Sequence, residues 1–219
     1  MKDIVIYGKG DFARLVLHYL QLDNRYRVVC FCVDKDFHDG DSYLGYPLYN
    51  IDDYSTVEDF EKAIKSNGLD AFLAVGYTSL LTRNRMFEKI RSKGFNLINI
   101  VCDGVVIDKT AKVGVNNIFL QNVIVQPFST IKDNNYFGSR CTICHDSFIG
   151  NNNYFAPNAI IAGFSSVGNN NFLGIGSVVS DNVTLADNCI LGASSTLLSD
   201  ALQEGKYFGV PAKLYNKEK

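Results

Sequence analysis

The chain contains an adjacent pair of residues suited to proton transfer, His145 and Asp146. Neutral imidazole has an ordinary pKa of about 6.5, so it is the usual base for taking a proton from an amine or a hydroxyl. A neighbouring carboxylate fixes the tautomer of an imidazole and raises its basicity. We therefore predict that His145 is a general base oriented by Asp146. An exposed histidine with no chemical role is the alternative interpretation.

Two further residues follow His145 at a fixed distance. Gly163 comes eighteen positions later, and Asp181 follows Gly163 by the same number. If eighteen residues make one turn of a repeating structure, the three residues stack at about one strand spacing of 4.8 Å. Glycine has no side chain to block its backbone N–H, which could receive the oxygen of a tetrahedral acyl intermediate. An extended ligand could lie along this column.

A repeat of six residues supplies the periodicity. Every sixth residue from Ile107 to Leu197 is apolar. The residues four positions after these are mostly small: Ala111, Ser129, Cys141, Ser147, Ala159, Ser165, Ser177, Cys189, Ser195 and Ala201. Large inward residues followed by small ones suit a narrow triangular prism, in which the small residue fills the space near a corner. The pattern predicts a parallel β-helix.

Asparagines mark a second period, of eighteen residues. They lie in turn-like runs at Asn116, Asn134, Asn152, Asn170 and Asn188. Apart from glycine, asparagine is the residue that best tolerates the left-handed backbone conformation. Three hexapeptides therefore make one coil, these asparagines stack at one corner, and the repeat predicts about five coils.

Residues 3–100 alternate between strand and helix patterns. Strands are predicted at 3–7, 27–33, 70–75 and 96–101, helices at 11–22, 56–67 and 79–93, and a loop with a short strand at 36–55. Four parallel strands with helical crossovers make a small Rossmann-like α/β sheet. We expect two domains, a Rossmann-like nucleotide-sugar-binding domain at 1–101 and an all-β β-helix domain at 102–219.

A glycine-rich turn joins the first predicted strand to its helix. Gly8 and Gly10 open the pattern G-x-G-x-x-A. Bare backbone N–H groups at such a turn, together with the helix N-terminus, can hold a phosphate. Asp34, at the end of the second strand, could receive a ribose hydroxyl or cap a turn. A tight turn without a ligand is the alternative, and the small domain suits a sugar-linked nucleotide better than NAD.

Charge and composition disfavour several partners. The formal net charge is -2 and the pI is about 5.9, which gives no electrostatic case for nucleic acid or an anionic membrane surface. The N-terminal apolar run is too short for a signal peptide, and no stretch approaches the roughly twenty apolar residues of a membrane span. We expect a cytoplasmic protein without membrane insertion, and we interpret its six cysteines as reduced core thiols.

Haem and metal sites are also disfavoured. Residues 141–145 match C-x-x-C-H, the haem c attachment pattern. However, Cys141 falls on a small inward position of the repeat, and haem attachment would require export. The chain has three histidines, of which His145 alone lies in the repeat. Neither a zinc site nor a three-histidine metal-dependent hydratase is therefore expected.

Several motifs together resemble those of the left-handed β-helix sugar acyltransferases. They are the hexapeptide repeat containing Cys144-His145-Asp146, the runs Ala156-Pro157-Asn158-Ala159 and Gly209-Val210-Pro211-Ala212-Lys213, and the opening turn at Gly8. The most similar branch contains sialic-acid O-acetyltransferases and the N-acetyltransferases of UDP- or dTDP-linked amino sugars. The resemblance covers nearly the whole chain.

The resemblance implies a homotrimer with acyl-CoA sites between adjacent prisms. His145 matches the family's general base, Asp146 the acidic residue that orients it, and Gly163 the amide on the oxyanion side. Many members carry a second histidine where this chain has Tyr154. The residues implied to contact acetyl-CoA are Tyr154, Gly163, Asp181 and Lys213. Those implied to bind the nucleotide are Gly8, Gly10, Asp34 and Lys35.

The implied activity is transfer of an acetyl group from acetyl-CoA to the amino group of a nucleotide-linked amino sugar. The amine would attack the thioester directly, with His145 as the base. An O-acetyltransferase acting on a hydroxyl of sialic acid or of a polysaccharide precursor is one alternative. A non-catalytic trimer that binds nucleotide sugars is the other.

Overall fold

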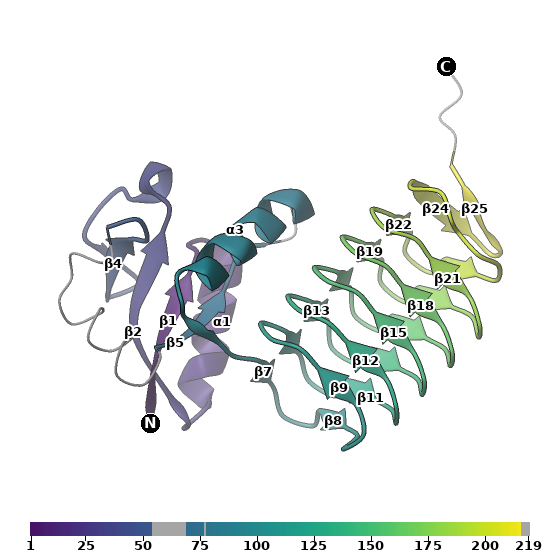
Figure 1. The fold of residues 1–219 in the computed structure, drawn as a ribbon, viewed down its shortest axis with the longest axis horizontal. Helices are drawn as coiled ribbons and strands as arrows, with labels where there is room; N and C mark the ends of the chain where they lie inside the picture. Colours follow the sequence, from purple (N-terminus) through teal and green to yellow (C-terminus); the bar gives the residue numbers. More distant parts are fainter. Residues whose placement is uncertain (54–68, 77, 216–219) are drawn as a thin grey trace. The chain divides into compact units, whose positions relative to one another are not determined.

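The computed structural model describes residues 1–53, 69–76 and 78–215 (Figure 1). The chain separates into two compact units, Met1–Ile100 and Val101–Lys219. Each unit has an apolar cluster of its own, so each has the core that a domain requires. The helix predicted at 56–67 lies outside the described residues.

The first unit is built on a six-stranded sheet in the order β3-β4-β2-β1-β5-β6. Its strands are β1 (Lys2–Tyr7), β2 (Tyr26–Val33), β3 (Ser42–Tyr43), β4 (Tyr46–Asn50), β5 (Asp70–Leu73) and β6 (Asn96–Leu97). Neighbouring strands are parallel except in the β3–β4 hairpin. The predicted parallel sheet is confirmed, and the segment 36–55 contributes two strands to it rather than one.

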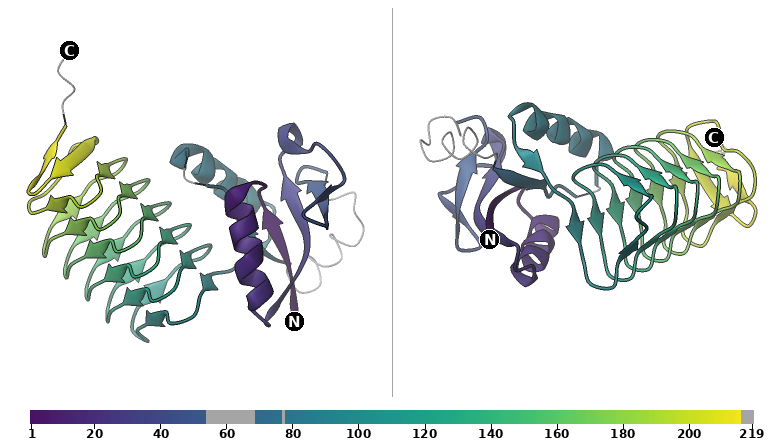
Figure 2. Two further views of the ribbon diagram at one scale, coloured as in Figure 1. Left: turned by 180° about the vertical axis from the view of Figure 1, so that it is seen from behind. Right: turned by 60° about the horizontal axis from the view of Figure 1, so that its bottom comes forward.

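Two helices cover opposite faces of this sheet, as views from the front and from behind show (Figure 1, Figure 2). Helix α1 spans Asp11–Leu22 and helix α3 spans Leu80–Ser92, while a short 3-10 helix, η1, spans Lys35–Phe37. Alternate residues of β1 point to opposite faces, and the face with Val5 and Tyr7 packs against α3. Among the described residues, no helix has the length and apolar character that crossing a bilayer requires.

The strand predicted at 96–101 is wrong in its extent. The chain pairs with β5 only along β6, and it then pairs with the β-helix along β7 (Ile100–Val101). Leu97, at the end of β6, and Ile100, at the start of β7, are both buried. The apolar pattern of residues 96–101 therefore does not show where one unit ends and the next begins.

The second unit is a left-handed parallel β-helix with three sheets, whose stacked coils are seen from the side in Figure 2. The first sheet contains β7, β10 (Ile118–Phe119), β13 (Tyr136–Phe137), β16 (Tyr154–Phe155), β19 (Phe172–Leu173), β22 (Ile190–Leu191), β24 (Lys206–Gly209) and β25 (Ala212–Leu214). The second contains β8 (Val106–Ile107), β11 (Ile124–Val125), β14 (Thr142–Ile143), β17 (Ile160–Ile161), β20 (Val178–Val179) and β23 (Thr196–Leu197). The third contains β9 (Lys112–Val113), β12 (Thr130–Ile131), β15 (Phe148–Ile149), β18 (Ser166–Val167) and β21 (Thr184–Leu185).

The inward residues of the β-helix form one apolar core, as the six-residue period predicts. The period-six residues from Phe119 to Leu197 are all buried. The rings of Phe119, Phe137 and Phe155 stack with their centroids 4.8 Å apart from one coil to the next. The small residues four positions later are buried as well, except the half-buried Ala111 near the start of the repeat. The hexapeptide interpretation is therefore confirmed.

The five periodic asparagines form a ladder along one corner. Each has φ between 56° and 60°, so each adopts the left-handed conformation predicted for it. The side-chain amide of each of the first four donates to the side-chain oxygen of the asparagine one coil further on, at 2.9, 2.9, 2.7 and 3.3 Å. The ladder ties successive coils together and satisfies polar groups in a corner where Asn116, Asn134 and Asn152 are fully buried.

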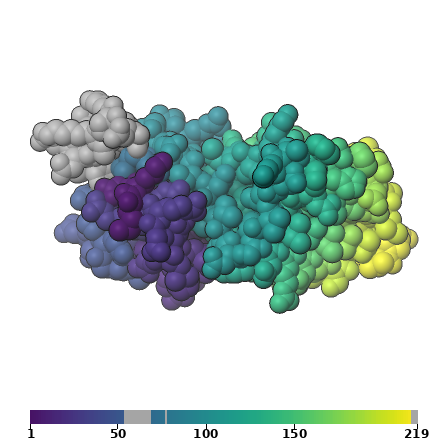
Figure 3. Space-filling view, turned by 90° about the horizontal axis from the view of Figure 1, so that it is seen from below, coloured from purple at the N-terminus to yellow at the C-terminus, as the bar shows by residue number. Residues whose placement is uncertain are grey.

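The β-helix is longer than the predicted five coils. Its sheets contain eight, six and five strands, because pairing begins at β7, before Ile107, and continues through β24, beyond Leu197. Strand β25 ends the first sheet as an antiparallel partner of β24. Each coil covers the preceding one, so the colour of the surface changes steadily from teal to yellow along this unit (Figure 3).

Replacing Asn152 with alanine should lower the free energy of unfolding of the β-helix by about 2–3 kcal/mol. The change removes its side-chain bonds to Asn134 and Asn170 and leaves alanine in a left-handed conformation. Urea unfolding followed by circular dichroism measures the loss. Asn188→Ala is the matched control, because Asn188 has nearly the same φ but is exposed, with long bonds of 3.3 and 3.4 Å. Equal losses at both positions would contradict the importance of the buried ladder.

Candidate functional site

His145 lies in the turn that leads from β14 in the second sheet to β15 in the third. Its side chain is 49% exposed, which agrees with an outward position at a corner. The side-chain oxygen of Gln126 accepts the His145 backbone N–H at 3.1 Å. Asp146 follows with φ 57°, so the chain turns sharply just after the histidine. The imidazole therefore faces solvent, and its backbone is tied to the preceding coil through Gln126.

The imidazole of His145 is oriented by Asp146. Its Nδ1 lies 3.0 Å from Oδ2 of the aspartate. An ionised carboxylate only accepts hydrogen bonds, so Nδ1 carries the hydrogen in this contact. Nε2 of the neutral ring is then the atom with a free lone pair, and it is the atom that can take a proton from a substrate.

Gly163 lies against this ring. A Cβ atom at Gly163 would be 2.9 Å from Cε1 and 3.0 Å from Nε2 of His145, so any side chain would displace the imidazole. Its carbonyl accepts the Asn182 N–H at 3.0 Å. Within the described part of the chain, no hydrogen-bond acceptor faces the Gly163 N–H. The corner therefore places an imidazole beside a backbone N–H that has no partner among the described residues.

The thiol of Cys144, next to His145, is a poor nucleophile. Burial is the main cause that raises its pKa above the ordinary value, and the negative charge of Asp181 adds to the effect. A raised pKa lowers the fraction of reactive thiolate at neutral pH. All six cysteines are free, as predicted. Four of them are buried core thiols, whereas Cys102 and Cys144 are only half-buried, so the prediction of a core position is wrong for these two.

Tyr154 and Lys213 are not brought to His145 within one chain. Tyr154 lies on the first sheet, where its ring stacks between those of Tyr136 and Phe172 at centroid distances of 4.3 and 5.1 Å. Lys213 is exposed on β25, in the hairpin that ends this sheet. The turn with His145 joins the other two sheets, so a ligand that reaches all of these residues must involve more than one corner.

The glycine-rich turn of the first unit is closely packed. A Cβ atom at Gly8, which has φ 133°, would lie 2.6 Å from the backbone oxygen of Ala74, so glycine is required for the approach of β1 to β5. Gly10 precedes α1, and its N–H donates to the hydroxyl of Tyr43 at 3.0 Å. That hydroxyl donates in turn to the Gly10 carbonyl at 3.2 Å. Tyr43 thus occupies a backbone donor that a phosphate would use.

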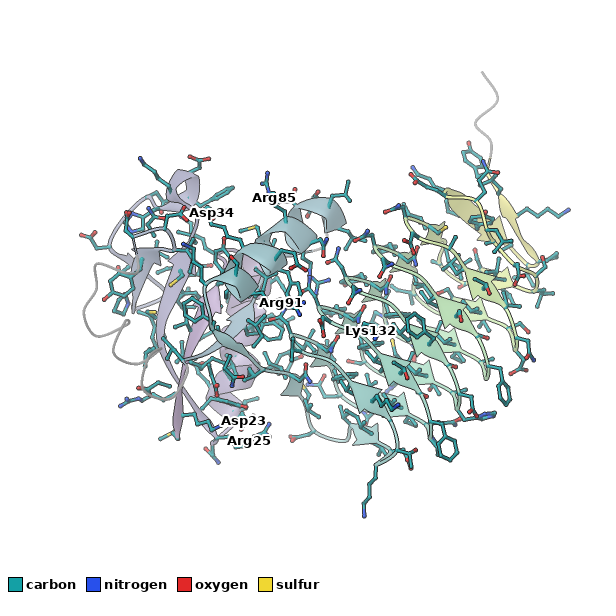
Figure 4. The ribbon with its side chains drawn as sticks, in the orientation of Figure 1. Asp23, Arg25, Asp34, Arg85, Arg91 and Lys132 are labelled. Carbon is teal, nitrogen blue, oxygen red and sulfur yellow. The ribbon has the colours of Figure 1, made fainter. Side chains whose placement is uncertain are left out.

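Asp34 lies just beyond the end of β2 (Figure 4). One carboxylate oxygen accepts both the Tyr7 hydroxyl at 2.7 Å and the Lys89 ammonium at 2.5 Å. Burial first, and the bond to Asp34 second, raise the pKa of Tyr7, so the phenol remains a neutral donor. Lys89 also binds Asp52 at 2.9 Å. The exposed Lys35 lies in η1, directly after Asp34.

Sequence reasoning missed several residues of these two sites. Tyr43 and Lys89 reach their partners over 33 and 55 positions, and no local pattern indicates such contacts. Phe164 packs edge-on against His145, with ring centroids 5.1 Å apart; it stands eighteen positions after Asp146, so the coil period could have found it. Among the described residues, no group of three or more His, Cys, Asp or Glu side chains is arranged to hold a metal ion.

Two known families match the chain in sequence. The PglD N-terminal domain matches residues 3–90, and the bacterial transferase hexapeptide, as six repeats, matches residues 164–199. No curated protein matches the chain in sequence. Residues 3–90 are therefore similar to a PglD N-terminal domain and residues 164–199 to hexapeptide repeats, and the resemblance drawn from the motifs is confirmed.

Solved structures share the whole fold. PerB from Caulobacter crescentus, in complex with CoA and GDP-perosamine, has a TM-score of 0.83 and 24% identity, over 99% of this chain and 98% of PerB. The acetyltransferase domain of PglB from Neisseria gonorrhoeae, in complex with acetyl coenzyme A, has a TM-score of 0.79 and 20% identity, over 98% and 99%. WeeI from Acinetobacter baumannii has a TM-score of 0.78 and 16% identity, over 98% and 100%. At these identities the likeness establishes the fold.

Replacing Asp181 with asparagine should lower the pKa of the Cys144 thiol, because the change removes a negative charge that disfavours the thiolate. Alkylation of Cys144 by iodoacetamide, followed peptide by peptide across pH, should then start at a lower pH. Asp103→Asn is the control, because it removes an exposed carboxylate from the first coil of the repeat. An unchanged alkylation profile in the Asp181 variant would show that burial alone sets this pKa.

Proposed function

We propose that this chain, which joins a PglD N-terminal domain to a left-handed β-helix of hexapeptide repeats, is an acyl-CoA-dependent sugar N-acetyltransferase. Its acceptor is the amino group of a nucleotide-linked amino sugar, and acetyl-CoA is its co-substrate. The observation that carries the proposal is the corner at His145. There a base oriented by a carboxylate lies beside a backbone N–H that has no partner in the described structure.

The acetyl group passes directly from CoA to the sugar in this proposal. The amine attacks the thioester carbonyl to form the new C–N bond, and Nε2 of His145 takes the proton that the amine loses. The N–H of Gly163 donates to the oxyanion while the intermediate is tetrahedral. The C–S bond then breaks, and the proton held by the imidazole can pass to the departing sulfur. Asp146 keeps the ring in the tautomer that this transfer needs.

Cys144 takes no covalent part in the reaction. A route through an acetylated cysteine would need a thiolate, and both the burial of Cys144 and the charge of Asp181 oppose its formation. Among the described residues, no cationic group lowers the pKa of this thiol. Direct attack by the substrate amine needs only the base and the amide donor already present at the corner.

One solved structure of the same fold supports an amine acceptor, because it is a perosamine N-acetyltransferase from Caulobacter crescentus in complex with CoA and GDP-perosamine. The PglB domain, in complex with acetyl coenzyme A, supports the acyl donor. We assign Gly8, Gly10, Asp34 and Lys35 to the nucleotide part of the acceptor, because they lie at the carboxyl ends of β1 and β2, where ligands of parallel sheets bind. PerB binds a GDP-linked sugar, whereas UDP- or dTDP-linked sugars were predicted for this chain. Binding measurements with all three nucleotides decide which nucleobase the site accepts.

The proposed assembly is a homotrimer. On the outer face of the second sheet, Val106, Ile124 and Ile160 are 59, 42 and 39% exposed and recur at the same position of the repeat. Burying such a stripe against neighbouring prisms is favourable. Tyr154 and Lys213, on the first sheet of one chain, would then contact acetyl-CoA that lies beside Gly163 and Asp181 of the next. A consumer of acetyl-CoA and nucleotide sugars is expected in the cytoplasm.

Replacing His145 with alanine should lower kcat by roughly 10²–10⁴-fold, the usual contribution of a general base. Release of the CoA thiol from acetyl-CoA, in the presence of UDP-, dTDP- and GDP-linked amino sugars, measures the rate. Binding of acetyl-CoA by calorimetry should change little. His18→Ala is the matched control, because His18 is an exposed histidine on α1.

Each result of this experiment has a distinct meaning. Near-full transfer by the His145 variant would overturn the assignment of the base. Release of thiol only with sugar hydroxyls would make the protein an O-acetyltransferase. Binding of nucleotide sugars by a wild type that transfers nothing would make it a non-catalytic binding protein.

Replacing Tyr43 with phenylalanine should tighten nucleotide-sugar binding about two- to tenfold, the equivalent of one neutral hydrogen bond. The hydroxyl of Tyr43 now bonds to the Gly10 N–H, and its removal leaves that donor free for a phosphate. Titration calorimetry with nucleotide sugars measures Kd, and Tyr46→Phe on the neighbouring strand β4 provides the control. An unchanged Kd would place the phosphates away from Gly10.

A further inference from the structure

Phe164 is an exposed aromatic residue beside the base. It directly follows Gly163 and is 57% exposed. Its ring lies edge-on to the imidazole of His145, with the ring centroids 5.1 Å apart and the ring planes at 84°. The β-helix core does not contain this ring. Among the described residues, the ring of Phe164 instead contacts the imidazole of His145.

The backbone at Phe164 is unusual for an aromatic residue. Its φ is 57°, in the left-handed region where side chains with a Cβ are disfavoured and asparagine is tolerated. One coil further on, the equivalent residue is Asn182, with φ 58°. Asparagine would therefore fit the corner at residue 164 better than phenylalanine. A strained residue next to reactive groups is an indication of a role there.

Phe128 is a second phenylalanine at the corner position that Phe164 occupies. It occupies the same corner position on the other side of Asp146, with φ 63° and 64% exposure. Its N–H donates to the Thr110 hydroxyl at 2.9 Å. No ring contact to His145 is present for Phe128 in the described structure. The two phenylalanines thus share conformation and exposure and differ in their contact with the base.

We propose that Phe164 is a positioning residue that holds the imidazole of His145 in its working orientation. The inference rests on the proposed function, in which Nε2 of His145 is the proton acceptor. Three groups then enclose the ring. Asp146 fixes Nδ1 at 3.0 Å, Gly163 leaves the space that Cε1 and Nε2 occupy, and the edge-on ring of Phe164 restrains the imidazole on a further side.

The arrangement explains why the ring is retained despite its backbone conformation. A hydrogen bond at Nδ1 alone lets an exposed imidazole swing about its side-chain torsions. Edge-to-face packing by an aromatic ring restricts that motion without offering a competing acceptor to Nε2. Small misplacements of a base can reduce a rate substantially. Phe164 therefore acts on the reaction through His145 and not by contact with the reacting atoms.

The test is the replacement of Phe164 with asparagine, the residue that the next coil carries at this position. We expect the variant to fold with a melting temperature equal to or above that of the wild type. Its kcat for acetyl transfer should fall roughly tenfold, with KM for the nucleotide sugar changed less than about twofold, because positioning affects the reaction step. Phe164→Tyr keeps the edge of the ring and should restore most of kcat. Phe128→Asn is the matched control and should leave kcat unchanged.

A second measurement does not depend on activity. Diethyl pyrocarbonate modifies exposed imidazole nitrogens, and mass spectrometry of the peptide containing His145 follows its rate at that residue alone. The rate should rise at least threefold in Phe164→Asn and stay constant in Phe128→Asn, because only the first change releases the ring.

The outcomes separate the two proposals. A wild type that acetylates no amino sugar overturns the proposed function, and the modification rates then still test the contact of Phe164 with His145. A wild type that is active, with equal kcat and equal modification rates in the Phe164 and Phe128 variants, overturns the positioning role. A fall in kcat that Phe164→Tyr does not restore overturns it as well.

Discussion

Parallel pairing of one coil with the next is the constraint on which the candidate site depends. Thr142 and Ile143 pair with Ile160 and Ile161, so residues eighteen apart are held at one strand spacing. That register brings Gly163 against the imidazole and sets Phe164 one coil away from Asp146. The candidate site needs no special loop, because a corner of the β-helix already stacks the groups that the proposed chemistry requires.

The corners also explain how chemical residues enter a structure that otherwise has little room for them. Each corner needs a left-handed residue, and eight of the thirteen non-glycine residues that adopt this conformation in the β-helix are asparagines. The turns around His145 carry Phe128, Asp146 and Phe164 instead. Arg140 and Ser194 are the other two non-asparagine residues in this conformation. Of the three beside His145, Asp146 and Phe164 contact its imidazole.

The regular part of the molecule could be predicted because its information is local and repeated. The six-residue period identifies the inward residues, and the eighteen-residue period places Gly163 beside His145. The extent of β7 could not be predicted, because one apolar run serves two units. The contacts of Tyr43 with Gly10 and of Lys89 with Asp34 join segments far apart in the chain. Tyr154 illustrates a further limit, since its stack with Tyr136 and Phe172 follows from the coil period but its ligand does not.

The asparagine ladder has a consequence for how this protein can change length. Its rungs repeat every eighteen residues, so the insertion or loss of one whole coil beyond Asp181 preserves every inward and corner position. A single inserted residue within a coil would move the following inward side chains to the outer face and would break the ladder. Length variation among homologous chains should therefore occur in steps of one coil, and tandem duplication is the genetic change that the architecture tolerates best.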